Sequence, residues 1–286
     1  MKTRFSRQIL AFGEEGQRSI EAQRVGIVGL GGIGSHVAQA LAYFGVQSFV
    51  LVDDDYVEES NLNRLIGGTA KDVEKETLKI RVAERLVWAV APAAKIDPIP
   101  QNLRSAKAID ALTSCTAIFG CVDHDGPRLV LMELACAYEI TFIDCATEIV
   151  PDSKKSRIED FGGRVVVCRP GDFCLACANE IDLEMAKAEL ESEDVRALRK
   201  AHGYGLGEEV VAPAVVSLNG IIANLAVTEF LVWTTGIREP FRKRFYRGMR
   251  GIILENKDVR RKDCYNCGYL VGKREAVNLY RYVKTQ

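Results

Sequence analysis

The sequence lacks any uninterrupted hydrophobic run near the roughly 18 residues that a membrane-spanning helix requires. Its first residues also lack the pattern of a secretory signal peptide. The net charge is only −1, from 38 basic and 39 acidic residues, so no strong field draws the chain to nucleic acid or to an anionic membrane. We therefore expect a cytoplasmic protein that binds neither.

A disulfide framework is missing as well, because the nine cysteines are odd in number and irregularly spaced. Four of them form two Cys-x-x-Cys pairs, Cys174 with Cys177 and Cys264 with Cys267. Two such pairs suit a tetrahedral structural Zn²⁺. A redox pair is the alternative, but that chemistry needs one pair at a helix N-terminus. We predict a four-cysteine zinc site that ties the C-terminal segment to the middle of the chain.

The sequence does contain a strand-like apolar run that ends in glycines, at residues 25–34. Gly29, Gly31 and Gly34 fit G-x-G-x-x-G, in which the glycines allow a tight turn, close approach of a phosphate and helix packing. The helix expected at 35–44 then offers free N–H groups to an anion. Asp53 ends a second strand about nineteen residues later, where a ribose hydroxyl is held. An ordinary tight turn is the alternative, whereas nothing after Asp53 favours an NAD oxidoreductase.

The remaining pattern predicts an α/β fold, Rossmann-like, with a mostly parallel sheet and an antiparallel C-terminal extension. We expect one domain over 1–286 with a crossover insertion at about 180–212 that contains a charged helix (180–201) and a glycine-rich flap (202–207). Further helices are expected at 71–91, 104–113, 128–138 and 213–233, and strands at 94–101, 117–123, 140–145 and 163–169, with short strands in 241–256 and 268–286.

Polar side chains follow two of the expected strands, at the edge where open α/β sheets bind ligands. Asp55, Asn61 and Arg64 come shortly after the strand that ends at Asp53. Asp123 ends another strand at the same edge and suits Mg²⁺, which takes a few carboxylates together with substrate phosphates. The alternatives are a solvated acidic loop and, for Asp123, a helix N-cap. Near the N-terminus, Arg7 either belongs to a solvated arm or reaches a phosphate.

Together these residues resemble the ThiF/MoeB/HesA family, prokaryotic relatives of the ubiquitin-activating (E1) adenylation domain. The resemblance runs over about residues 4–270 and rests on the order of its motifs. These are Arg4-Phe5-Ser6-Arg7-Gln8, the glycines of 29–34, Asp53-x-Asp55-x-Val57, Ser60-Asn61-Leu62-x-Arg64, Lys79 thirteen residues before Pro92, Asp123 with Arg128 five later, and the two cysteine pairs.

The resemblance implies adenylylation of the C-terminal carboxylate of a ubiquitin-like or sulfur-carrier protein that ends in Gly-Gly, with release of pyrophosphate. It implies ATP and Mg²⁺ as cofactors beside the structural zinc, and a homodimer in which Arg7 reaches the partner's ATP. The implied ATP-binding residues are Gly29, Gly31, Gly32, Gly34, Asp53 at the ribose, Asp55, and Asn61, Arg64 and Lys79 at the phosphates, with Asp123 at the Mg²⁺. Such chemistry needs positioning and charge neutralisation more than a nucleophilic side chain.

Family members that pass the activated chain to a thiol carry a cysteine between the two pairs, and residues 178–263 contain none. A thioester or persulfide step is therefore not expected there. Cys121, Cys136, Cys145 and Cys168 are expected to be buried, with Cys145 near the floor of the active site. One alternative is activation of a different substrate, either a peptide carboxylate or a modified tRNA base. Another is a non-catalytic nucleotide-binding subunit. The presence of Arg64, Lys79 and Asp123 argues against the latter, because a non-catalytic subunit would be free to lose them.

Overall fold

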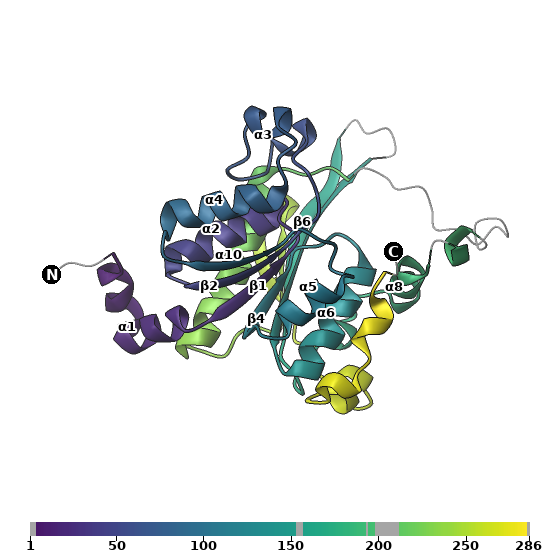
Figure 1. The fold of residues 1–286 in the computed structure, drawn as a ribbon. Coiled ribbons are helices and arrows are strands. Elements are labelled where there is room, and N and C mark those ends of the chain that lie inside the picture. Colours follow the sequence, from purple (N-terminus) through teal and green to yellow (C-terminus); the bar gives the residue numbers. More distant parts are fainter. Residues whose placement is uncertain (1–3, 153–156, 193, 198–211, 285–286) are drawn as a thin grey trace.

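A computed structural model describes residues 4–152, 157–192, 194–197 and 212–284. One eight-stranded sheet crosses the molecule in the order β3-β2-β1-β4-β5-β6-β7-β8 (Figure 1). The first five strands in this order are parallel and the last three are antiparallel, which confirms the predicted fold class. The strands are β1 (Arg24–Val28), β2 (Ser48–Val52), β3 (Lys95–Ile99), β4 (Ala117–Gly120), β5 (Thr141–Pro151), β6 (Ile158–Cys168), β7 (Lys243–Arg247) and β8 (Ile252–Glu255).

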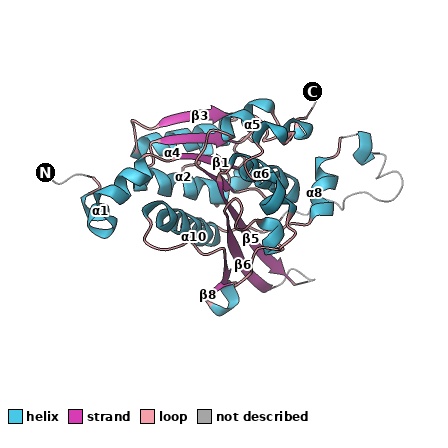
Figure 2. Ribbon diagram, turned by 90° about the horizontal axis from the view of Figure 1, so that it is seen from below, coloured by secondary structure: helices cyan, strands magenta, loops and turns pink. Residues whose placement is uncertain are grey.

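Helices cover both faces of the parallel part of the sheet (Figures 1 and 2). Helices α2, α4 and α10 pack on one face, and α5 and α6 pack on the other with the cysteine pairs. Because both faces are covered, the central strands are continuous apolar runs rather than alternating ones. The helices are α1 (Ser6–Glu21), α2 (Gly32–Phe44), α3 (Ala70–Glu74), α4 (Lys79–Val90), α5 (Ala106–Leu112), α6 (Asp125–Tyr138), α7 (Leu175–Ala178), α8 (Leu183–Leu190) and α10 (Val216–Thr235).

The single helix predicted over 71–91 is wrong, since the structure divides it into α3 and α4. Glu76 takes a left-handed conformation with φ of 48°, which a continuing helix does not allow. Leu78 is extended and forms an antiparallel bridge with Tyr56. The break places Lys79 at the first position of α4 rather than in the middle of a helix.

The strands predicted in 268–286 are also wrong. That segment forms short helical turns: η3 (Asn266–Leu270), η4 (Arg274–Ala276) and η5 (Leu279–Tyr282). It packs on α6, where Arg281 and the Tyr282 hydroxyl both donate to the Glu133 carboxylate, at 2.5 and 2.9 Å. The helix predicted over 180–201 is shorter, because α8 ends at Leu190, and the predicted flap at 202–207 lies outside the described residues.

Helix α10 is long and apolar enough, with a mean hydropathy of 1.5 over its best stretch, to cross a membrane by length and composition alone. The sequence predicts this helix at 213–233, although polar residues interrupt its hydrophobic run. In the structure, half of that stretch is buried inside the protein, and α10 packs against α2, β5 and β6. Its Phe230 ring lies 5.7 Å from the Phe119 ring of β4. We therefore regard α10 as a core helix.

Candidate nucleotide-binding site

The glycine loop, residues 29–34, joins β1 to α2 at the carboxyl edge of the parallel strands. Gly29 has φ of +83°, and a Cβ there would lie 2.5 Å from the carbonyl oxygen of Cys121. A Cβ on Gly34 would clash with the carbonyl oxygen of Gly29. Around Gly31, by contrast, no atom lies within 4 Å of a would-be Cβ. Gly29 and Gly34 thus build the turn, and Gly31 leaves the open backbone that a phosphate requires.

Gly32 brings the glycine loop against α10. A Cβ on Gly32 would clash with the side-chain amide of Asn219, which is buried. The Asn219 Oδ1 atom accepts a hydrogen bond from the Thr147 hydroxyl of β5 at 3.2 Å. Neither Asn219 nor Thr147 is among the residues predicted from the sequence, although an asparagine inside a strongly apolar helix is a signal for Asn219.

Asp53 ties the end of β2 to the glycine loop. Its carboxylate accepts hydrogen bonds from the backbone N–H of Leu30 at 2.6 Å and of Asp55 at 2.9 Å. Burial raises the pKa of Asp53, and these two hydrogen bonds oppose that rise. The carboxylate therefore lies at the end of β2 beside the glycine loop and holds the loop in place. Its role at a ribose stays a prediction.

The other predicted phosphate ligands lie around the glycine loop and at the start of α4. The Arg64 Cδ atom is 3.4 Å from the would-be Cβ of Gly32, and its guanidinium donates to the Ser60 carbonyl at 2.7 Å. Asn61 is buried and accepts from the Glu58 backbone N–H at 3.2 Å. The Lys79 ammonium, with a side chain 14% exposed, pairs with Asp55 at 2.7 Å. The structure thus gathers residues that are far apart in the sequence.

Asp123 lies in the turn between β4 and α6, and the preceding Val122 is 3.4 Å from the would-be Cβ of Gly29. Its side chain is 94% exposed. The N-cap of α6 is His124, so the alternative reading of Asp123 as the N-cap is wrong. A solvated carboxylate beside the glycine loop fits Mg²⁺, which keeps several waters when it bridges a protein to phosphates.

Beneath this turn, a row of buried ion pairs joins α6 to the strands. The fully buried Asp144 carboxylate of β5 pairs with Arg128 of α6 at 3.2 Å and with Arg164 of β6. Arg164 also pairs with Glu180 at 2.6 Å, and Glu180 pairs with Lys243 of β7 at 2.5 Å. Because each charge has opposite neighbours, the row fixes the Asp123 turn relative to the antiparallel strands and to the segment after Cys177.

Arg7 does not join this site within one chain. It is an exposed residue near the start of α1. The Phe5 ring there lies against Gly45, which follows the C-terminal end of α2. The glycine loop is at the other end of this 13-residue helix, about 20 Å away by the rise of an α-helix. A role for Arg7 at a partner's nucleotide stays a prediction.

The two cysteine pairs come together as predicted. Their four Sγ atoms lie within 4.8 Å of one another and are buried. The Cys174–Cys264 and Cys177–Cys267 sulfur distances are 3.5 and 3.9 Å, against about 3.8 Å for a tetrahedron of Zn–S bonds. Hydrogen bonding, first from Cys267, lowers the pKa of Cys174 to about 6, so the cluster favours a thiolate. The donor set fits a structural Zn²⁺.

The remaining predicted cysteines behave as packing residues. Cys136, Cys145 and Cys168 are buried as expected, and Cys121 is half-buried. Cys145 packs in the core shared with α2 and α10, where hydrogen bonding with Cys121 and full burial raise its pKa well above the ordinary thiol value. A thiol in that state is a poor nucleophile.

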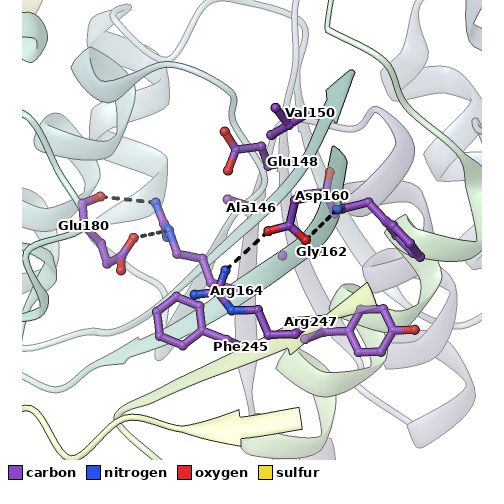
Figure 3. A pocket seen from close by; sticks show the side chains of 13 residues that line it. Ala146, Glu148, Val150, Asp160, Gly162, Arg164, Glu180, Phe245 and Arg247 are labelled. Carbon is purple, nitrogen blue, oxygen red and sulfur yellow. Dashed lines mark hydrogen bonds and ion pairs between the residues drawn. The ribbon is translucent and has the colours of Figure 1, made fainter. Parts of the chain in front are cut away.

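A pocket of about 150 Å³, which we call the extension pocket, opens on the antiparallel strands β5, β6 and β7 (Figure 3). On its floor Gly162 lies between Glu148 and Arg247, its strand neighbours, and leaves a gap without a side chain. Thr147 points to the opposite face of the sheet, where it contacts Asn219 of α10. Arg164 extends across it to Glu180, and Arg247 faces Asp160 at 3.9 Å (Figure 3).

The fold and the site first define a class: an α/β protein with a Rossmann-like glycine loop at the carboxyl edge of a mostly parallel sheet and a cluster of four cysteines. Residues 5–267 match the ThiF family, and the chain belongs to that family. It is 31% identical over 169 residues to the sulfur carrier protein ThiS adenylyltransferase of Escherichia coli, covering 58% of this chain and 62% of that protein. The chain thus spans about three-fifths of that relative's length.

Two further likenesses bear on the range of the family. The tRNA threonylcarbamoyladenosine dehydratase of Bacillus subtilis is 38% identical over 87 residues, which is 29% of this chain and 34% of that protein. The crystal structure of E. coli MccB with ATP superposes with a TM-score of 0.71 at 19% identity, covering 93% of this chain and 75% of that one. The latter likeness establishes a shared fold.

Proposed function

We propose that this protein is an ATP-dependent adenylyltransferase of the cytoplasm. Its substrate is the C-terminal carboxylate of a sulfur-carrier or ubiquitin-like protein that ends in Gly-Gly, and pyrophosphate is released. The observation that carries this proposal is the arrangement of three side chains near the glycine loop. Arg64 contacts Gly32, Lys79 pairs with Asp55 beside Asp53, and Asp123 follows Val122, which packs on Gly29. Membership of the ThiF family and the likeness to a ThiS adenylyltransferase support it.

In this proposal the chain positions the reactants and neutralises their charge. The Gly31 backbone receives a phosphate, Arg64 and Lys79 neutralise the polyphosphate, and Asp123 holds Mg²⁺, which supplies further charge neutralisation when bound. The substrate carboxylate is itself the nucleophile, so the buried cysteines take no part. Removing one of the two cations is expected to cost about 2.7–4 kcal/mol of transition-state stabilisation, by analogy with a single oxyanion-hole donor.

The extension pocket is the proposed entry for the carrier's tail. The pocket lies along the part of β5 that extends beyond Gly120 of β4, so a chain bound there would approach the glycine loop from the carboxyl edge of the parallel strands. The pocket's charged walls suit a polar tail, because Arg164, Arg247, Asp160 and Glu180 offer both signs. A homodimer is part of the same proposal, since Arg7 meets a nucleotide only if it belongs to another copy.

A second candidate keeps the site and changes the substrate. The likeness to a tRNA threonylcarbamoyladenosine dehydratase favours activation of a modified tRNA base. The formal net charge of −1 argues against it, because tRNA binding relies on neutralising many phosphates.

Product analysis tests the proposal. With ATP, Mg²⁺ and a Gly-Gly carrier, we expect AMP-bearing carrier by intact mass and pyrophosphate in solution. Arg64→Ala and Lys79→Ala should each slow formation of the adduct about 100- to 1,000-fold, whereas Lys107→Ala, an exposed lysine of α5, should leave it unchanged. Formation of ADP, or an adduct on tRNA and on no carrier, would contradict the proposal.

A further inference from the structure

The helix that follows Asp123 receives an N-terminal cap from far along the chain. His124, the N-cap residue of α6, makes no side-chain capping hydrogen bond. The backbone N–H of Gly126 instead donates to the Glu189 carboxylate of α8 at 2.5 Å. The other carboxylate oxygen lies 3.7 Å from the His124 ring, and the Glu189 side chain is only 19% exposed. A helix N-terminus favours such a carboxylate through its free N–H groups and its dipole.

Helix α8 contacts the first turn of α6 at both of its own ends. At the start of α8, the Asp182 backbone N–H donates to the Asp125 carboxylate at 3.0 Å. At the end, Gly126 allows the close approach, since a Cβ there would lie 3.2 Å from both Glu189 and Leu190. The crossover segment is therefore docked on the turn that carries Asp123.

The backbone of this turn sets the position of the Asp123 carboxylate. The carboxylate is 94% exposed and lies 3.8 Å from the His124 ring, so its place depends mainly on the backbone that carries it. Whatever orders the first turn of α6 thus orders the proposed Mg²⁺ ligand. The Glu189 carboxylate orders the first turn of α6 by accepting the hydrogen bond of the Gly126 backbone N–H.

We propose that Glu189 is a positioning residue for the Mg²⁺–ATP complex: by capping α6 it fixes the turn on which Asp123 lies. This inference rests on the proposed role of Asp123. It makes the crossover helix, which carries no cysteine, part of the nucleotide site's framework. Occupancy of Mg²⁺–ATP and docking of α8 should therefore favour each other.

The test compares Glu189→Ala and Glu189→Gln with Glu184→Ala, an 85% exposed glutamate of the same helix. The measurement is direct ATP binding over a Mg²⁺ titration, which needs no carrier. Glu189→Ala should raise the half-saturating Mg²⁺ concentration about fivefold, as expected for a lost cap of ~1 kcal/mol. Glu189→Gln should keep most of the wild-type value, because its amide oxygen still accepts from Gly126. Mg²⁺-free nucleotide binding should stay unchanged in all three variants.

An unchanged Mg²⁺ titration in Glu189→Ala would overturn the inference, and amide hydrogen exchange at Gly126–Arg128 would show whether the cap was lost. Absence of any Mg²⁺ effect in the wild type would overturn it too, together with the role of Asp123. If every Gly-Gly carrier fails as a substrate while Glu189→Ala still shifts the titration, the inference stands and the carrier proposal fails.

Discussion

The glycine loop gives different tasks to glycines only a few residues apart. Gly29 needs its positive φ and Gly34 needs its missing side chain, because both pack backbone against backbone. Gly31 has no neighbouring atom within 4 Å of a would-be Cβ, so packing does not exclude a side chain there. Its glycine therefore points to a ligand rather than to folding.

Alanine at these two positions should separate folding from binding. Gly31→Ala is expected to keep the wild-type Tm and to weaken ATP binding on the order of tenfold, or ~1.4 kcal/mol, because its methyl group intrudes on the phosphate. Gly34→Ala should lower both Tm and affinity, since it pushes α2 away from Gly29. Thermal unfolding and calorimetric titration with ATP measure the two effects. Unchanged ATP affinity in Gly31→Ala would place the phosphates elsewhere.

Among the secondary-structure elements, the short helix α3 depends on one ion pair. Arg85 of α4 donates two hydrogen bonds to the Asp72 carboxylate at 2.8 and 2.9 Å, and Asp72 also caps α3 through Thr69. These hydrogen bonds hold the pKa of Asp72 far below its ordinary value. The Arg85–Asp72 pair therefore holds α3 against α4, on the other side of the break that precedes Lys79.

The sign of the pH effect follows from this lowered pKa. A depressed folded-state pKa stabilises the protein above the unfolded value of about 3.9, and this contribution fades as pH falls toward the folded value. Asp72→Asn should therefore lower the free energy of unfolding at pH 7, with a deficit that shrinks between about pH 4 and pH 2. Urea unfolding across that range measures it, with Asp97→Asn as an exposed control. A deficit that stays constant with pH would contradict this account.

At the scale of the whole molecule, the cluster of Cys174, Cys177, Cys264 and Cys267 connects two distant segments of the chain. It joins the segment after β6 to the segment after β8, and Glu180 and Asp258 connect both segments to Lys243. The four-cysteine cluster packs with α6 on one face of the sheet, whereas the glycine loop faces α10 on the other. The four cysteines are therefore expected to act mainly on stability, whereas nucleotide binding depends on the glycine loop and, through the Asp123 turn, on the first turn of α6.

Zinc removal should separate these two properties. Elemental analysis is expected to find one zinc per chain, and chelation should lower the Tm by several degrees, because the metal crosslinks distant segments. ATP binding at temperatures well below the Tm should change little. Cys264→Ser is expected to reproduce the loss of stability, while Cys115→Ser, which lies outside the four-cysteine cluster, should retain the metal. Zinc-free protein with full thermal stability would contradict a structural role.

The sequence predicts what local pattern and spacing encode. The apolar runs predict the parallel strands, the glycine pattern predicts the turn after β1, and the two Cys-x-x-Cys pairs predict the four-cysteine cluster. The break before Lys79 could not be predicted from the sequence, because it depends on the left-handed conformation of Glu76 and on the bridge between Leu78 and Tyr56. Asn219 and Glu189 escape because their partners, Gly32 and Gly126, lie far away in sequence. The C-terminal turns escape because α6 supplies their partner Glu133.

The central claim is carboxylate adenylylation, and ATP–pyrophosphate exchange tests it most directly. The assay uses Mg²⁺, labelled pyrophosphate and small carrier proteins ending in Gly-Gly, beside the same carriers without the last glycine. We predict exchange that requires both the carrier and its terminal glycine. Absence of exchange with every such carrier, in protein that still binds ATP, would contradict the claim.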